Sequence, residues 1–182
     1  LPSAAELETL EPFRAGLPAE VFGEPYVPPE TDGSGRDRAI LRRAAGLFAD
    51  AGWKQDGTRL VDANGAPFEI EFLIDAQVFE RILTPYIQNL KAIGINASIR
   101  RVDSAQYERR VKSYDFDIVT SRFVMSLTPG TELRSYWSSE AAKSEGSRNL
   151  AGISSPVIDA LIEKIVAAKS RQELVVTTRA MD

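Results

Sequence analysis

The sequence has 182 residues and contains no cysteine and no histidine. Their absence excludes zinc sites built on thiolate or imidazole ligands. It also excludes Ser-His-Asp and Cys-His nucleophilic systems, because both need an imidazole to accept the proton of the nucleophile. Disulfides cannot stabilise the fold, so cysteine usage says nothing about the compartment in which the protein works.

Long apolar runs and an excess of positive charge are also missing. No stretch approaches the roughly 20 apolar residues that cross a bilayer. The formal net charge of −4 leaves no basic surface that would attract nucleic acid. The hydrophobic share of 43% and charged share of 26% are typical of a globular domain, and the length suffices for one domain with a substantial core.

The two ends resemble positions inside a longer protein. The chain starts with Leu1 instead of methionine and shows no secretory leader pattern. Residues 173–182 have the composition of a helix, and no stop signal follows them. We therefore expect a fragment whose C-terminal domain is incomplete at its C-terminal end.

Proline dominates the first segment. Six of the ten prolines fall within residues 1–35: Pro2, Pro12, Pro18, Pro25, Pro28 and Pro29. Proline fixes φ and pushes the residue before it toward extended backbone. Residues 1–35 are therefore predicted to form an extended connecting arm with at most a short helix over Ala4–Leu10. Its aromatic and aliphatic side chains predict that it lies against another surface.

Helices and strands alternate after the arm. Apolar residues at helical spacing predict helices over 37–51, 76–93 and 105–113. The second contains Pro85 and is predicted to be one kinked helix, with two abutting helices as the alternative. Strands are predicted over 68–74, 95–102 and 117–124, and the Asp56-Gly57 and Asn64-Gly65 turns predict a hairpin before the first of them. Strands joined through helices are typically parallel. Residues 36–182 are therefore predicted to form an α/β domain, with a small, mainly parallel sheet flanked by helices.

The C-terminal third is expected to be mostly helical. A short helix is predicted near residues 132–137. Ser155 and Pro156 have the residue types of an N-cap and a first helical position, and Ser170 is suited to cap the last helix.

Two groups of residues could support chemistry or binding. Asp115 and Asp117, two positions apart before a strand, could act as an acid and base pair in a carboxylate-based hydrolase, although turn carboxylates are more often solvated. Arg148, in a polar loop, could bind a ligand carboxylate, and Trp137 could line a cleft or pack in a core. No metal site and no cofactor site is predicted.

Several motifs resemble the family 5 extracellular solute-binding proteins of ABC transporters, the dipeptide, oligopeptide and nickel-binding group. They occur in the family's order and at suitable spacings along nearly the whole chain: Pro2–Arg14, Ile40–Trp53, Leu90–Ile95, Tyr114–Asp117 and Asn149–Ile162. Glu11–Arg14 and Ser126–Leu133 further resemble the branch linked to oligopeptide and microcin C uptake.

The resemblance implies most of the C-terminal lobe of a periplasmic-binding-protein type II fold, in a two-lobed protein that closes on its ligand. It implies a periplasmic, non-catalytic component of an ABC importer that captures peptides and delivers them to the permease subunits. The parent protein is expected to be monomeric and to be secreted by a signal peptide. The alternatives from the residues alone are the carboxylate-based hydrolase and a non-catalytic interaction domain.

The resemblance also implies ligand-binding residues, since peptide binders of the family hold the ligand largely through main-chain pairing. The set implied here is Ser121, Arg122, Phe123, Val124, Ser126, Arg148 and Asn149. Many peptide binders of the family carry a tryptophan and an acidic residue just after this strand, and the acid takes the peptide amino terminus. Residues 122–127 contain no acid, which argues against recognition of a free amino terminus here.

Overall fold

The computed structural model describes all 182 residues and divides them into two compact units. The first, which we call the helical unit, combines Leu1–Val27, Lys112–Tyr114 and Arg122–Asp182. The second, which we call the α/β unit, combines Pro28–Val111 and Asp115–Ser121. The predicted boundary after residue 35 stays a prediction. None of the helices has the length and apolar character needed to cross a membrane.

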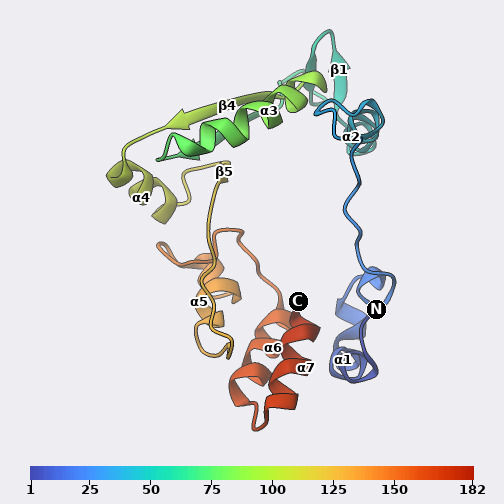
Figure 1. The fold of residues 1–182 in the computed structure, drawn as a ribbon, viewed down its shortest axis with the longest axis vertical. Helices are drawn as coiled ribbons and strands as arrows, with labels where there is room; N and C mark the ends of the chain where they lie inside the picture. Colours follow the sequence, from blue (N-terminus) through green and yellow to red (C-terminus); the bar gives the residue numbers. More distant parts are fainter. The chain divides into compact units, whose positions relative to one another are not determined.

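A three-stranded parallel sheet forms the centre of the α/β unit (Figure 1). Its strands are β3 (Glu69–Ile74), β4 (Asn96–Arg101) and β5 (Ile118–Val119), in the order β4-β3-β5. The predicted parallel arrangement is therefore confirmed, and β3 is the central strand with a partner on each side.

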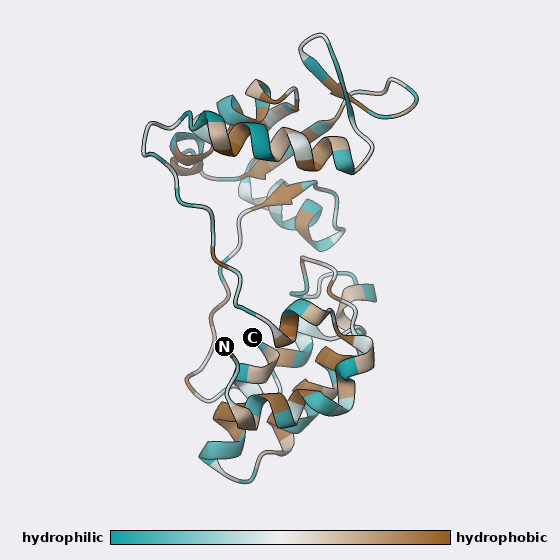
Figure 2. Cartoon of the chain, turned by 90° about the vertical axis from the view of Figure 1, so that its right-hand side faces the viewer, coloured by the Kyte–Doolittle hydropathy of each residue, from teal (hydrophilic) through white to brown (hydrophobic).

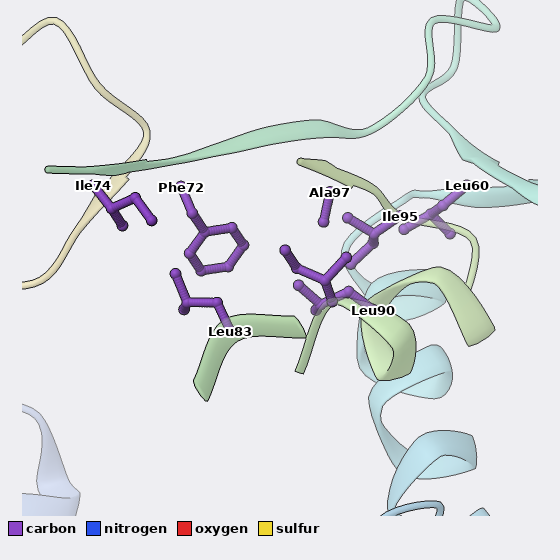
Figure 3. Close-up of a cluster of buried hydrophobic side chains, with 8 residues drawn as sticks. Leu60, Phe72, Ile74, Leu83, Leu90, Ile95 and Ala97 are labelled. Atoms are coloured by element: carbon purple, nitrogen blue, oxygen red, sulfur yellow. The ribbon is translucent and has the colours of Figure 1, made fainter. Parts of the chain in front are cut away.

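One face of the sheet packs on helix α3 (Val78–Ala92) and forms the core of this unit (Figure 3). The strand period of two places Phe72 and Ile74 on this face, where they meet Leu83 of the helix. The other buried members of the cluster are Leu60, Ile87, Leu90, Ile95 and Ala97. Pro85 lies inside α3, which continues as one helix through it, as predicted.

The opposite face of the sheet is mostly polar. Asn96 on β4 donates a hydrogen bond of 2.7 Å to Glu69 on β3. Arg110, on helix α4 (Ser104–Lys112), forms ion pairs of 2.9 Å with both Glu71 and Asp115. Arg110 thus pairs with two carboxylates at this face, and only Leu73 brings a fully buried apolar side chain to it.

Local signals position the first helix and the hairpin of the α/β unit. Asp37 caps helix α2 (Arg38–Asp50) by accepting hydrogen bonds from the N–H groups of Ala39 and Ile40. The hairpin consists of β1 (Lys54–Asp56) and β2 (Arg59–Val61), as the turn dipeptides predicted. Its second strand approaches the end of α3, where the N–H of Leu60 donates to the carbonyl of Gly94 at 2.7 Å.

The helical unit has two small apolar clusters. Helix α6 (Pro156–Ala167) contributes to both, and helices α1 (Ala4–Leu10) and α7 (Arg171–Met181) pack against one another. The buried residues are Leu10, Val157 and Leu161 in one cluster and Leu133, Ile162 and Ile165 in the other. Hydrophilic and hydrophobic residues alternate along these helices (Figure 2), as expected for helices with one buried side.

The proline-rich arm is less extended than predicted. The short helix α1 is present, and Ser3 and Glu6 form a capping box at its start. Two 3₁₀ helices follow, η1 (Glu11–Gly16) and η2 (Ala19–Phe22). Pro12 is the second residue of η1, and proline is tolerated in the first turn because its missing N–H would have no partner within the helix there.

The third strand is much shorter than the predicted span of 117–124. Only Ile118 and Val119 pair with β3, and the carboxylate of Asp117 accepts a hydrogen bond from the N–H of Glu71 at 2.8 Å. Residues 121–128 are all exposed and lie in no strand. Their apolar and β-branched composition predicted a strand, but strand formation also requires a neighbouring strand to pair with.

Two glycines test how closely the hairpin approaches α3. Gly52 and Gly94 have nearly the same φ, +91° and +90°, but only Gly94 is crowded: an added Cβ would lie 2.7 Å from the backbone N of Leu60. Gly52→Ala is expected to cost about 1 kcal/mol for the left-handed backbone alone. Gly94→Ala is expected to cost roughly 2 kcal/mol more, because the hairpin must move. Urea denaturation of both variants gives this difference, and equal losses would contradict the close approach.

Candidate functional site

Three aromatic side chains gather in the helical unit and form what we call the aromatic cluster: Phe123, Tyr136 and Trp137. The ring centroid of Phe123 lies 5.7 Å from that of Tyr136 and 4.8 Å from that of Trp137. Tyr136 and Trp137 belong to helix α5 (Leu133–Trp137), whereas Phe123 comes from the irregular stretch after β5. Tyr136 is buried, but Phe123 remains 43% exposed, so the cluster presents an apolar surface to solvent.

Arg148 joins the aromatic cluster through Tyr136. Its Nη1 donates a hydrogen bond of 2.7 Å to Tyr136 Oη, and its Cζ lies 5.4 Å from the centroid of the same ring. Tyr136 Oη in turn donates to the carbonyl of Val124 at 3.4 Å. One phenol therefore connects the arginine with the exposed stretch after β5.

Asn149 fixes the loop that carries Arg148. It is fully buried, with 0% exposure. Its Nδ2 donates to the carbonyls of Ser138 at 3.0 Å and Ile153 at 2.8 Å, and its Oδ1 accepts from the N–H of Ile153 at 2.9 Å. The backbone N–H of Arg148 donates to the carbonyl of Ser135 on α5 at 3.2 Å. The loop is thus fastened to the end of α5 by the backbone N–H of Arg148 and by the side chain of Asn149.

Tyr114 supports the same loop from a strained backbone conformation. Its φ is +56°, which is uncommon for a residue other than glycine. Its Oη donates to the carbonyl of Ser144 at 2.9 Å and lies 2.6 Å from Ser147 Oγ, which also accepts from the N–H of Asn149. Strained residues persist where surrounding contacts hold them, and the contacts of this one lie directly before Arg148.

The structure brings together some of the predicted ligand-binding residues. Phe123, Val124 and Arg148 meet around Tyr136. Arg122, which directly precedes Phe123 in the sequence, is exposed to solvent. The N–H groups of residues 122–124 form no hydrogen bond.

The other predicted residues lie differently. Ser121 is exposed and belongs to the α/β unit. Ser126 accepts a hydrogen bond from the N–H of Thr128 within its own turn. The side chain of Asn149 is wholly used by backbone partners, so its part in a site is to hold Arg148. Sequence reasoning gave no site role to Tyr136, whose signal was the aromatic pair Tyr136-Trp137 beside a loop. It named Tyr114 only as the first residue of the Tyr114–Asp117 motif.

The two candidate catalytic carboxylates are engaged separately within the α/β unit. Asp115 forms an ion pair with Arg110, and Asp117 accepts the N–H of Glu71. Each therefore has a structural partner, and nothing positions the two as an acid and base pair. The structure also has no group of three or more acidic side chains that could hold a metal ion.

The buried amide gives a direct test of this arrangement. Asn149→Ala leaves the carbonyl and the N–H of Ile153 without partners, whereas the carbonyl of Ser138 keeps its bond from the N–H of Ala142. The expected loss of unfolding free energy is about 3 kcal/mol, since each unsatisfied buried group costs roughly 1–3 kcal/mol. Asn89→Ala on α3, which removes a partly exposed amide, is the matched control and is expected to change stability little. Thermal denaturation that shows equal losses for the two variants would contradict the bridging role.

Comparison with known proteins gives consistent matches along the chain. The family model described as bacterial extracellular solute-binding proteins, family 5 Middle, matches residues 13–145. The chain is 44% identical over its whole length to the probable peptide-binding protein YejA of Agrobacterium fabrum, of which it covers 30%. The chain therefore spans less than a third of the length of that relative.

Solved structures share the fold at low sequence identity. The oligopeptide-binding protein AppA of Bacillus subtilis, in complex with a nonapeptide, is 17% identical, with a TM-score of 0.67 over 97% of this chain and 36% of AppA. The oligopeptide-binding protein of Thermus thermophilus, complexed with a pentapeptide, is 22% identical, with a TM-score of 0.62 over 97% of this chain and 33% of that protein. These likenesses confirm the predicted fold class, a lobe of a periplasmic binding protein with a small parallel sheet.

Proposed function

Since this chain belongs to the bacterial extracellular solute-binding proteins of family 5, we propose that it is part of the peptide-capturing component of an ABC importer. The proposal is supported by the family match and by the name of the peptide-binding relative in Agrobacterium fabrum. The complete protein would work in the periplasm as a monomer, bind peptide there and deliver it to the permease subunits. Its domains would divide near residue 35, and it would catalyse no reaction.

The observation that carries the proposal is the exposed stretch next to the aromatic cluster. The N–H groups of Arg122, Phe123 and Val124 have no partner, and the side chain of Val124 is 81% exposed. Unpaired backbone in an accessible stretch can pair with the main chain of a peptide, which gives affinity with little dependence on the peptide sequence. The neighbouring aromatic surface would bury apolar side chains of the ligand.

The proposal assigns a binding role to this stretch and no catalytic role to the carboxylates. Asp115 forms an ion pair with Arg110, and Asp117 accepts a hydrogen bond from the N–H of Glu71, so both carboxylates have structural partners. A peptide binder needs no activated nucleophile, which agrees with a chain that lacks both cysteine and histidine.

Calorimetric titration of the complete natural protein with short peptides tests the binding role. Phe123→Ala and Trp137→Ala remove aromatic contact surface and are each expected to weaken peptide binding by about 5- to 30-fold. Ile82→Ala is the control, because Ile82 is an equally apolar side chain, 65% exposed, on α3 of the α/β unit. It is expected to leave the affinity unchanged.

Two outcomes would contradict the proposal. One is the absence of heat on titration with any peptide of two to nine residues. The other is peptide binding that is the same in the wild type and in both aromatic variants. Thermal unfolding of each variant without peptide separates a binding effect from a loss of fold.

A further inference from the structure

We propose that Arg148 binds a carboxylate of the captured peptide, so that the site prefers ligands with a negative group at this point. The inference rests on the proposed peptide-binding function and adds the chemical class that the site selects. Three features of the helical unit carry it: the unused edge of the guanidinium, the charge of the exposed stretch, and the fixed position of the arginine.

The guanidinium has unused donors in the geometry that carboxylates bind. Arg148 uses Nη1 for its bond of 2.7 Å to Tyr136 Oη. Nε and Nη2 have no partner, and the side chain forms no ion pair. Nε and Nη2 form one edge of the planar group, and a carboxylate can accept from both at once with two parallel hydrogen bonds.

The exposed stretch beside the aromatic cluster carries charge of one sign only. Residues 120–131 contain no aspartate or glutamate, and their one charged residue is Arg122. Glu132, the first acid after the stretch, accepts the N–H of Gly130 at 3.1 Å. A ligand ammonium group would find no counter-charge on this stretch, whereas a carboxylate would find Arg148. Charge complementarity therefore favours an anionic group on the ligand.

The arginine is held before any ligand arrives. Its backbone N–H donates a hydrogen bond to α5, and the next residue, Asn149, is fixed by its buried amide. The Tyr136 ring lies under the guanidinium. A long side chain that is already oriented loses less conformational entropy on binding, so more of the interaction energy appears as affinity. Tyr136 is accordingly a positioning residue, and the contact with the carboxylate belongs to Arg148.

The carboxylate could come from the C-terminus of the peptide or from an acidic side chain. Three tetrapeptides separate these sources: tetra-alanine with a free C-terminus, the same peptide amidated, and an amidated peptide with one glutamate. Isothermal calorimetry with the complete natural protein gives an affinity for each. A preference for the first peptide assigns the terminal carboxylate, and a preference for the third assigns the side chain.

The wild-type protein is expected to bind the better of the two carboxylate peptides about 10- to 100-fold more tightly than the neutral amide. Arg148→Gln is expected to reduce this ratio to about one while still binding the amide like the wild type. Arg148→Lys is expected to keep part of the preference, because an ammonium supplies charge without the planar fork. Tyr136→Phe is expected to lower the ratio without abolishing it.

The matched control is Arg134→Gln. Arg134 lies on the same helix as Tyr136, but its guanidinium forms an ion pair of 2.7 Å with Glu163 and takes no part in the aromatic cluster. This variant is expected to keep the full ratio. Equal affinity of the wild type for the carboxylate and neutral peptides would overturn the inference, as would a preference that survives Arg148→Gln. No binding of any peptide would instead overturn the proposed function, so the two failures are distinguishable.

Discussion

A buried neutral amide holds the region on which the site is built. Asn149 sits where no water reaches, and it joins the backbone just after α5 to the backbone that leads into α6. Because donors and acceptors in such a place cannot turn to solvent, a shift of the loop by one residue would leave several of them unpaired. The position of Arg148 relative to Tyr136 follows from this constraint, and so does the surface that both residues present.

In the α/β unit, the two faces of the parallel sheet are covered in different ways. Parallel sheets are normally covered by helices on both faces. Here α3 covers one face with apolar side chains, while most of the other is stabilised by paired polar groups such as Glu71 with Arg110. Arg110 and Glu71 are only partly exposed, and one guanidinium shared by Glu71 and Asp115 offsets the repulsion between the two carboxylates next to the central strand. Arg110 thereby also fixes the turn that leads into β5.

The sequence predicted those elements whose signals are local. Ser155 and Pro156 before α6 and Ser170 before α7 each determine a helix start through contacts a few residues away. The length of β5 depends on how far a neighbouring strand extends, and no local pattern encodes it. The site shows the same division: Arg148 was recognisable as an available cation, but the burial of Asn149 depends on carbonyls that only the fold brings to it.

The two units are interleaved along the chain, and synthesis runs in one direction. Every residue of the α/β unit has been translated once Ser121 is made, so that unit can become ordered early. Helix α1 precedes the α/β unit in the chain, yet it packs on α7, which follows that unit. Bringing α1 and α7 together closes a long loop, which costs conformational entropy before the contacts between the two helices form. Leu10 and its apolar neighbours therefore lack their partners on α6 and α7 while the α/β unit is being translated, which makes α1 a natural point of contact for a chaperone.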